Sequence, residues 1–250
     1  LYSGPEFSEK CFPEEEFLHD VELLDENLSG LHAKPYPATG IRLAQLKATI
    51  LDLEKSGVLV KGDSSFTSPI FYVTKKASGT KTACKGRLCF DYRRLNQNIK
   101  AQHFPLALKE NFFQNAAKYK KFCIVDIANA FMSIGLTERA KRLCAIITPF
   151  GVYLPQRTPF GLKTSPSAFC RALDKVIGDL DFLSSYMDDI VVGGQNDEEL
   201  LDNLITLFSR LSKFNLKIQL DKCLFFQKEV KILGTIFSQQ GKRIDPKKVE

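Results

Sequence analysis

The sequence lacks the patterns that define several common classes of protein. No run of apolar residues is long enough to span a bilayer and no secretory signal pattern is present, so nothing indicates a membrane protein. The seven cysteines form no C-x-x-C pair and have no histidines nearby, which argues against a zinc site. Their odd number, with several inside apolar runs, is typical of reduced thiols in an intracellular protein.

Charge is distributed unevenly along the chain. Of 250 residues, 44% are hydrophobic and 11% aromatic, which is enough to bury one large core or two modest ones. Residues 1–30 carry nine acids against one lysine, a balance of −8, so the overall charge of +6 leaves +14 on residues 31–250. A basic body favours a polyanionic partner because phosphate contacts release counterions. Ordinary soluble surfaces can be equally basic, so charge alone leaves the partner open.

The motif YMDD at 186–189 places two adjacent carboxylates, Asp188 and Asp189, at a predicted tight hairpin between short apolar runs. Like charges this close repel each other, and a bound divalent cation would remove the repulsion. An acidic surface turn is the simpler interpretation of this motif alone. A second apolar strand, 122–126, also ends in an acid, Asp126. Neighbouring strands could bring these carboxylates together, and oxygen ligands without histidine suit Mg²⁺.

Helical periodicity predicts three helices. Apolar residues recur at helical spacing over 41–56, and Gly57 ends that pattern. Ser165 followed by proline is typical of an N-cap, and an apolar stripe over 169–180 continues the helix. NDEE at 196–199 resembles a capping box before an amphipathic helix that ends near Asn215. Helices on one face of a mostly antiparallel sheet indicate an α+β fold.

Six motifs, in one fixed order over roughly residues 35–250, resemble those of reverse transcriptases from gypsy-like LTR retrotransposons (Metaviridae). They are FTSPI at 66–70 with the lysines after it, RLCFDYRRLN at 87–96, VDIANAF at 125–131, TPFG at 148–151, PFGLKTSP at 159–166, and the closing pair LDKC at 220–223 and ILG at 232–234. A single YMDD is weak evidence, whereas six ordered motifs are strong.

The resemblance implies a right-hand polymerase fold of class α+β, with fingers and palm subdomains and an antiparallel palm sheet backed by helices. The implied divisions are an acidic leader or linker at 1–30, fingers at 31–100 and 134–160, palm at 101–133 and 161–241 with a primer-gripping hairpin, and the start of a thumb at 242–250. No thumb, RNase H, integrase or protease motif occurs, so we expect a fragment of a longer polyprotein or a truncated relic. The acidic leader could also act as a phosphate mimic in a basic cleft, although an ordinary linker is simpler.

The resemblance assigns the metal site to four residues. Asp126 and Asp188 would be shared by two Mg²⁺ ions, with Mn²⁺ as a substitute, and the backbone carbonyl of Ile127 would complete the coordination of one ion. Asp189 would ligate metal or support the site through hydrogen bonds. The structural alternatives are an N-cap at Asp126 and a turn acid at Asp188.

Charged residues are implied to act on the phosphates. Lys222 is the candidate general acid that protonates the pyrophosphate leaving group, and Lys217 competes with it. Lys75 and Arg87 align with the residues of the fingers that grip the triphosphate. Solvated surface lysines are the alternative for Lys75, Lys217 and Lys222.

The remaining implied nucleotide contacts come from NAF at 129–131 and from the PFG motif. Phe131 would exclude a 2′-hydroxyl from the sugar site, next to Asn129 and Ala130, although a core aromatic is the alternative. The NAF triplet departs from the Ser-Gly-Tyr common in gypsy-like elements. Phe160 would pack against the nucleotide, and Gly161 would let the backbone approach the template.

The implied function is an RNA-directed DNA polymerase that adds deoxynucleotides to a primer 3′-hydroxyl by two-metal-ion phosphoryl transfer. Its partners would be RNA and DNA template-primer, deoxynucleoside triphosphates, the missing polyprotein domains and, as one option, a second copy in a dimer. The implied location is a cytoplasmic virus-like particle, with the nucleus as a second compartment. The alternative is a co-opted, non-catalytic module that binds nucleic acid or a protein. A palm from telomerase or an intron-encoded enzyme fits the PFGLK motif less well.

Overall fold

The computed structural model describes residues 12–74, 86–104, 119–232 and 234–244, which fold into two compact units. Unit 1 combines Leu1–His103 with Phe131–Ala168, and unit 2 combines Phe104–Ala130 with Phe169–Glu250. The chain therefore passes from unit 1 into unit 2, returns to unit 1 and enters unit 2 again.

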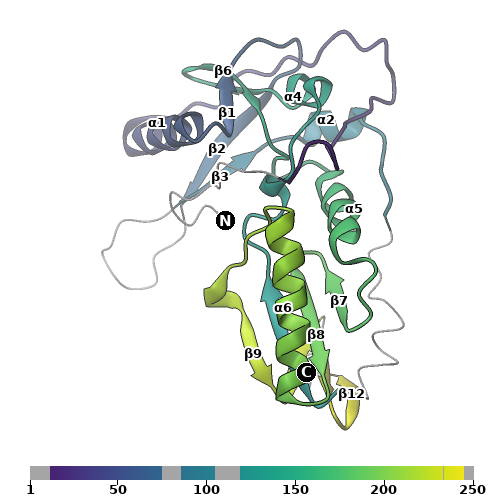
Figure 1. Ribbon diagram of the computed structural model, residues 1–250. Coiled ribbons are helices and arrows are strands. Elements are labelled where there is room, and N and C mark those ends of the chain that lie inside the picture. Colours follow the sequence, from purple (N-terminus) through teal and green to yellow (C-terminus); the bar gives the residue numbers. More distant parts are fainter. Residues whose placement is uncertain (1–11, 75–85, 105–118, 233, 245–250) are drawn as a thin grey trace. The chain divides into compact units, whose positions relative to one another are not determined.

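Unit 1 is built on a five-stranded sheet in the order β1-β6-β5-β2-β3. Four of these strands, β1, β2, β3 and β6, are labelled in Figure 1. Its strands are β1 (Leu59–Lys61), β2 (Ser68–Thr74), β3 (Gly86–Phe90), β5 (Ile146–Thr148) and β6 (Gly151–Pro155). The β2–β5 pair is parallel, and the other pairings are antiparallel. The helices are α1 (Gly40–Lys55), α2 (Arg93–Asn98) and α4 (Glu138–Leu143), with a 3-10 turn η1 (Phe131–Ser133).

Helix α1 confirms the helix predicted over 41–56. Leu46, Ile50 and Leu53 recur at intervals of three and four residues, and all three are buried in the core of unit 1. Gly57 follows with a φ of 68°, a left-handed conformation that glycine adopts without steric cost.

The acidic segment before α1 belongs to unit 1 and is not the separate leader or linker that we expected. Phe12, Val21 and Leu23 are all buried. The Phe12 N–H donates to the Ser133 carbonyl at 2.8 Å. From residue 19 to 24 buried residues alternate with more exposed ones, as in a half-buried strand, so Val21 and Leu23 enter the core while Glu22 and Leu24 face outward.

Unit 2 contains a four-stranded antiparallel sheet in the order β7-β8-β4-β9. The strands are β4 (Lys121–Asp126), β7 (Leu183–Tyr186), β8 (Asp189–Gly194) and β9 (Leu224–Gln227).

Helix α6 (Asp197–Lys213) packs against β8 and β4 (Figure 1). Helix α5 (Ser165–Ile177) begins in unit 1 and continues into unit 2. A short 3-10 turn, η2 (Leu220–Lys222), precedes β9. The α+β class and the antiparallel palm sheet are confirmed.

Unit 2 also contains a second antiparallel sheet, formed by its last three strands. Its order is β10 (Glu229–Ile232), β11 (Thr235–Ser238) and β12 (Gly241–Ile244). Phe122 and Val191 of the first sheet form one core with Val230 and Phe237 of the second. Strand β12 covers residues where we expected the thumb to begin, so 242–244 belong to this sheet instead.

Both predicted helices of unit 2 form. The Asn196 side chain accepts the Glu199 N–H at 2.8 Å, and the Glu199 carboxylate accepts the Gln195 N–H at 2.9 Å, which gives the expected cap of α6. The prediction of Ser165 as N-cap is wrong: it is already helical, and its hydroxyl donates to the Pro159 carbonyl at 2.8 Å. Within the described ranges no helix is both long enough and apolar enough to cross a membrane.

Candidate active site

Strand pairing brings the three predicted acids to one end of the palm sheet. Asp126, the last residue of β4, lies directly opposite Asp189, the first residue of β8. Tyr186 pairs with Asp189 at the end of the β7–β8 hairpin, so Met187 and Asp188 form a two-residue turn. Met187 has a φ of 51°, a left-handed conformation that costs a non-glycine residue about 1–2 kcal/mol. The tight turn predicted at YMDD is confirmed, and it stores strain beside the acids.

Backbone hydrogen bonds hold this end of β4 between two other segments. The Ile127 N–H donates to the Asp188 carbonyl at 2.9 Å. On the other side, the Gln219 N–H donates to the Asp126 carbonyl at 2.9 Å, and the Ala128 N–H donates to the Lys217 carbonyl at 2.8 Å. The acids therefore sit on a rigid backbone, which is a requirement for a precise ligand site.

The carboxylates destabilise one another. Burial raises the pKa of Asp188, and the nearby charges of Asp126 and Asp189 raise it further. Burial and the charge of Asp126 likewise raise the pKa of Asp189. The Asp188 Oδ1 atom is buried and has no hydrogen-bond partner among the described residues. An unsatisfied buried oxygen costs about 1–3 kcal/mol, so the site is strained as a set of acids alone.

Lys222 supplies the nearest positive charge. Its Nζ lies 3.4 Å from both carboxylate oxygens of Asp126, and its charge lowers the pKa of Asp188 and Asp189. These contacts are longer than the about 2.7–2.9 Å of a strong charge-assisted hydrogen bond. Lys222, the predicted proton donor, thus lies beside the acids. The competing Lys217 contributes its backbone carbonyl, which accepts the Ala128 N–H.

The donor set fits an open magnesium site rather than a closed cage. In the described part of the chain, no three or more histidine, cysteine, aspartate or glutamate side chains form a group that could hold a metal ion by themselves. Mg²⁺ in phosphoryl-transfer sites is typically held by one or two carboxylates, with water and substrate phosphates as the other ligands. Hard oxygen donors, mutual repulsion and the unpaired Asp188 oxygen all suit such an ion.

The predicted nucleotide-binding aromatics meet within unit 1. The ring centroids of Phe131 and Phe160 lie 5.5 Å apart at an interplanar angle of 57°. Gly161 has a φ of 89°, and a Cβ there would lie 3.0 Å from the Phe90 carbonyl oxygen. The fold itself therefore requires glycine at 161, and its expected closeness to a template stays a prediction.

The other predicted contacts are placed only in part. Asn129 follows β4 with a φ of 49°, and Ala130 is buried. Arg87 lies in β3 opposite Val73, while Lys75 lies outside the described residues. The hairpin predicted to hold the primer exists as β10–β11, with Ile232 paired to Thr235.

Sequence reasoning missed Cys170, on α5, as a neighbour of the acids. The Met187 N–H hydrogen-bonds to its sulfur, while burial and the charge of Asp188 raise the pKa of the thiol. The Cys170 sulfur therefore stabilises the strained turn by accepting the Met187 N–H. A single cysteine in a predicted helix carries no sequence signal for such a contact.

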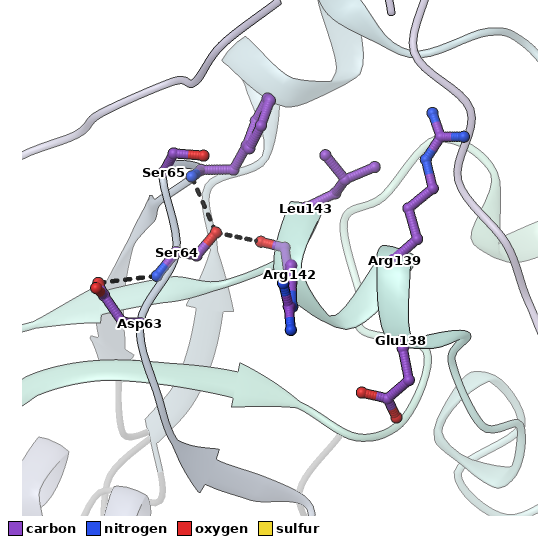
Figure 2. A pocket seen from close by; sticks show the side chains of 8 residues that line it. Asp63, Ser64, Ser65, Glu138, Arg139, Arg142 and Leu143 are labelled. Atoms are coloured by element: carbon purple, nitrogen blue, oxygen red, sulfur yellow. Dashed lines mark hydrogen bonds between the residues drawn. The ribbon is translucent and has the colours of Figure 1, made fainter.

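A surface pocket of unit 1 does not qualify as the active site. It measures about 630 Å³ and lies between the loop at 63–66 and α4 (Figure 2). The Ser64 hydroxyl donates to the Arg142 carbonyl at 2.7 Å, which ties the loop to the helix. Two acids balance the two arginines that line the pocket, and none of the predicted site residues lines it.

A palm of this topology, with acids at the β4–β8 ends, defines a polymerase of the right-hand type, and solved structures agree on the fold. A foamy viral protease-reverse transcriptase in complex with an RNA/DNA hybrid is similar with a TM-score of 0.76 and 21% identity, over 97% of this chain and 32% of that one. The same enzyme with double-stranded DNA has a TM-score of 0.73 and 22% identity, over 90% of this chain and 44% of that one.

The particular family follows from the sequence comparison. The family model "Reverse transcriptase (RNA-dependent DNA polymerase)" matches residues 74–237, so the chain belongs to this family. The Pol polyprotein of transposon 412 from Drosophila melanogaster is 31% identical over 224 residues, 88% of this chain and 18% of the relative. That of transposon gypsy, from the same fly, is 29% identical over 80% of this chain and 20% of the relative. The predicted gypsy-like relationship is confirmed, and the chain spans about a fifth of these relatives' length.

Proposed function

We propose that this chain forms the fingers and palm of an RNA-directed DNA polymerase that adds deoxynucleotides to a primer 3′-hydroxyl. The observation that carries the proposal is the pairing of Asp126 with Asp189 beside a strained turn that holds Asp188. The family membership and the foamy viral complexes with RNA/DNA hybrid and double-stranded DNA support a template-primer as the partner. The excess of positive charge over residues 31–250 suits that partner.

In this proposal Asp126 and Asp188, with Asp189 and the Ile127 carbonyl, would hold two Mg²⁺ ions, or Mn²⁺ in their place. When bound, such ions lower the pKa of the primer hydroxyl and neutralise charge on the phosphoryl group in transfer. The Lys222 ammonium donates a proton to the pyrophosphate oxygen that leaves. Its position beside Asp126 supports this role.

In this proposal the aromatic pair Phe131 and Phe160 selects deoxynucleotides over ribonucleotides. Phe131 leaves no space for a 2′-hydroxyl, so ribonucleotides are excluded sterically, and Phe160 packs against the nucleotide. The Phe131–Phe160 contact supports a joint role, because each ring limits the movement of the other. Lys75 and Arg87 bind the triphosphate, and the β10–β11 hairpin holds the primer end.

Primer extension tests the proposal. The protein is incubated with a primer on an RNA or a DNA template, with deoxynucleotides, and with or without Mg²⁺. We expect Mg²⁺-dependent extension on RNA. Binding of the template-primer without extension under any metal condition would contradict the proposal and favour the non-catalytic module instead.

A further inference from the structure

His19 is a buried histidine in the acidic segment, outside every motif that predicted the site. Only 1% of its surface is exposed. Its Nδ1 lies 3.1 Å from the Thr158 hydroxyl, and its Nε2 lies 3.0 Å from the Thr164 hydroxyl. Both ring nitrogens are therefore used, and each contact spans well over a hundred residues of sequence.

The two threonines flank the PFGLK loop at 159–163, which contains Phe160 and Gly161. Both hydroxyl-bearing residues are fully buried, at 0% exposure, so no solvent is available to replace the histidine. A buried hydroxyl left without its partner destabilises the folded state. The histidine thus joins the first and last residues that frame the loop.

The backbone of His19 is itself fixed. Its N–H donates to the Gly135 carbonyl at 2.9 Å, and its carbonyl accepts the Thr137 N–H at 3.1 Å. The Thr158 N–H donates to the Ile134 carbonyl at 2.8 Å in the same region. Because the backbone of His19 is held by hydrogen bonds, its ring can restrain Thr158 and Thr164 at the two ends of the loop.

The middle of the loop is held separately, by Asn96. Its side-chain Nδ2 donates to the Gly161 carbonyl at 2.8 Å, and its Oδ1 accepts the Lys163 N–H at 2.8 Å. With His19 at the two ends and Asn96 at the centre, hydrogen bonds restrain the loop that contains Phe160. Such multiple fixation of a short loop is expected where the loop must present a ligand-binding surface.

We propose that His19 is a positioning residue for nucleotide binding, which sets the geometry of the 159–163 loop by bridging Thr158 and Thr164. This inference rests on the proposed function, in which Phe160 and Gly161 contact the nucleotide. Only a ring with nitrogens on two sides can bridge the two hydroxyls. Asparagine places its amide near the position of Nδ1 and glutamine near that of Nε2, so each would retain one contact.

The test compares His19→Ala, His19→Asn and His19→Gln with the wild-type chain. Thr148→Val is the matched control, because Thr148 is a buried threonine of the same unit whose hydroxyl bonds to Gly151 and Phe150 in its own turn. We expect His19→Ala to raise the KM for deoxynucleotide roughly tenfold, because two hydrogen bonds that position the loop are lost, with kcat changed much less. The Asn and Gln variants should fall in between, and the control should lose thermal stability without a change in KM.

Amide hydrogen exchange over 158–164 gives a second readout that needs no activity. Faster exchange in His19→Ala, but not in Thr148→Val, supports the inference. An active His19→Ala protein with wild-type KM would overturn the inference and leave the polymerase proposal intact. If the wild-type chain extends no primer, the polymerase proposal fails and the nucleotide role falls with it, while the exchange data still decide whether His19 fixes the loop.

Discussion

Asp126 and Asp189 face each other as a paired couple across β4 and β8. Side chains directly opposite in an antiparallel pair share one face of the sheet, with Cβ atoms about 4.5–5.5 Å apart, and like charges there are destabilising. The palm sheet therefore ends in a repulsive contact, and the turn next to it adds a third acid. A site that is unfavourable by itself and favourable around a cation is what metal-dependent phosphoryl transfer requires.

Replacing Asp188 by asparagine should separate stability from activity. Removing one of the mutually repelling charges should raise the thermal midpoint of the metal-free protein. Mg²⁺-dependent extension should fall by about 1000-fold or more, since a metal ligand contributes several kcal/mol of transition-state stabilisation. The control is Asp181→Asn, an exposed acid of the same unit, which should change neither quantity. Extension that survives in Asp188→Asn would remove this residue from the site.

The effect of Mg²⁺ on stability should depend on pH. Asp188 and Asp189 have raised pKa values in the folded state, so their ionisation opposes folding as pH rises from the unfolded value of about 4. Mg²⁺ cancels that repulsion only when the acids are ionised. We expect the Mg²⁺-induced rise in melting temperature to be larger at pH 7.5 than at pH 5 in scanning calorimetry. An equal rise at both values, or the same rise in Asp188→Asn, would contradict the assignment.

Two substitutions of Lys222 distinguish proton donation from charge. Lys222→Met should lower kcat by about 100-fold because both are lost. Lys222→Arg keeps the charge beside Asp126, but a guanidinium does not release its proton. If Lys222 is the general acid, the arginine variant should be as slow as the methionine variant in single-turnover extension. Recovery of the rate by arginine would leave Lys222 an electrostatic role only.

Phe131→Val should admit ribonucleotides, because the smaller side chain opens space at the sugar. The measurement is the ratio of kcat/KM for deoxynucleotide over ribonucleotide, and we expect it to fall by at least tenfold. Phe150→Val is the control: Phe150 is a partly buried aromatic packed against the core of the same unit. Loss of stability without a change in the ratio, in both variants alike, would return Phe131 to a core role.

The acidic segment should behave as part of the core. Leu23→Ala should destabilise the protein by about 2–5 kcal/mol, because Leu23 is 4% exposed. The adjacent Leu24 is 63% exposed, and Leu24→Ala should change stability by less than about 0.5 kcal/mol. Urea unfolding of the two variants measures both. Equal, small effects would restore the interpretation of this segment as a linker.

Structural features that depend on local patterns could be predicted from the sequence. The strand run that ends in Asp126, the capping of α6 by Asn196 and the buried stripe of α1 are all local patterns, and each is present in the structure. The segment before α1 was misassigned because its high acidic content outweighed a short alternation of acidic and apolar residues at 20–23. That alternation was the available signal.

Features that depend on distant contacts could not be predicted. His19 meets Thr158 and Thr164 only once unit 1 has folded, and a lone histidine between acids carries no pattern that names its partners. Gly161 was assigned to template approach, whereas the fold needs glycine there for its φ and for the nearby Phe90 carbonyl. Family motifs identify positions, and packing decides what each position contacts.

The most direct test of the shared-ion claim is a crystal structure with Mn²⁺, template-primer and a deoxynucleotide, read by anomalous scattering. We predict an anomalous peak within bonding distance of both Asp126 and Asp188, with Lys222 released from Asp126. Peaks only at other sites, with Lys222 still bonded to Asp126, would contradict the account.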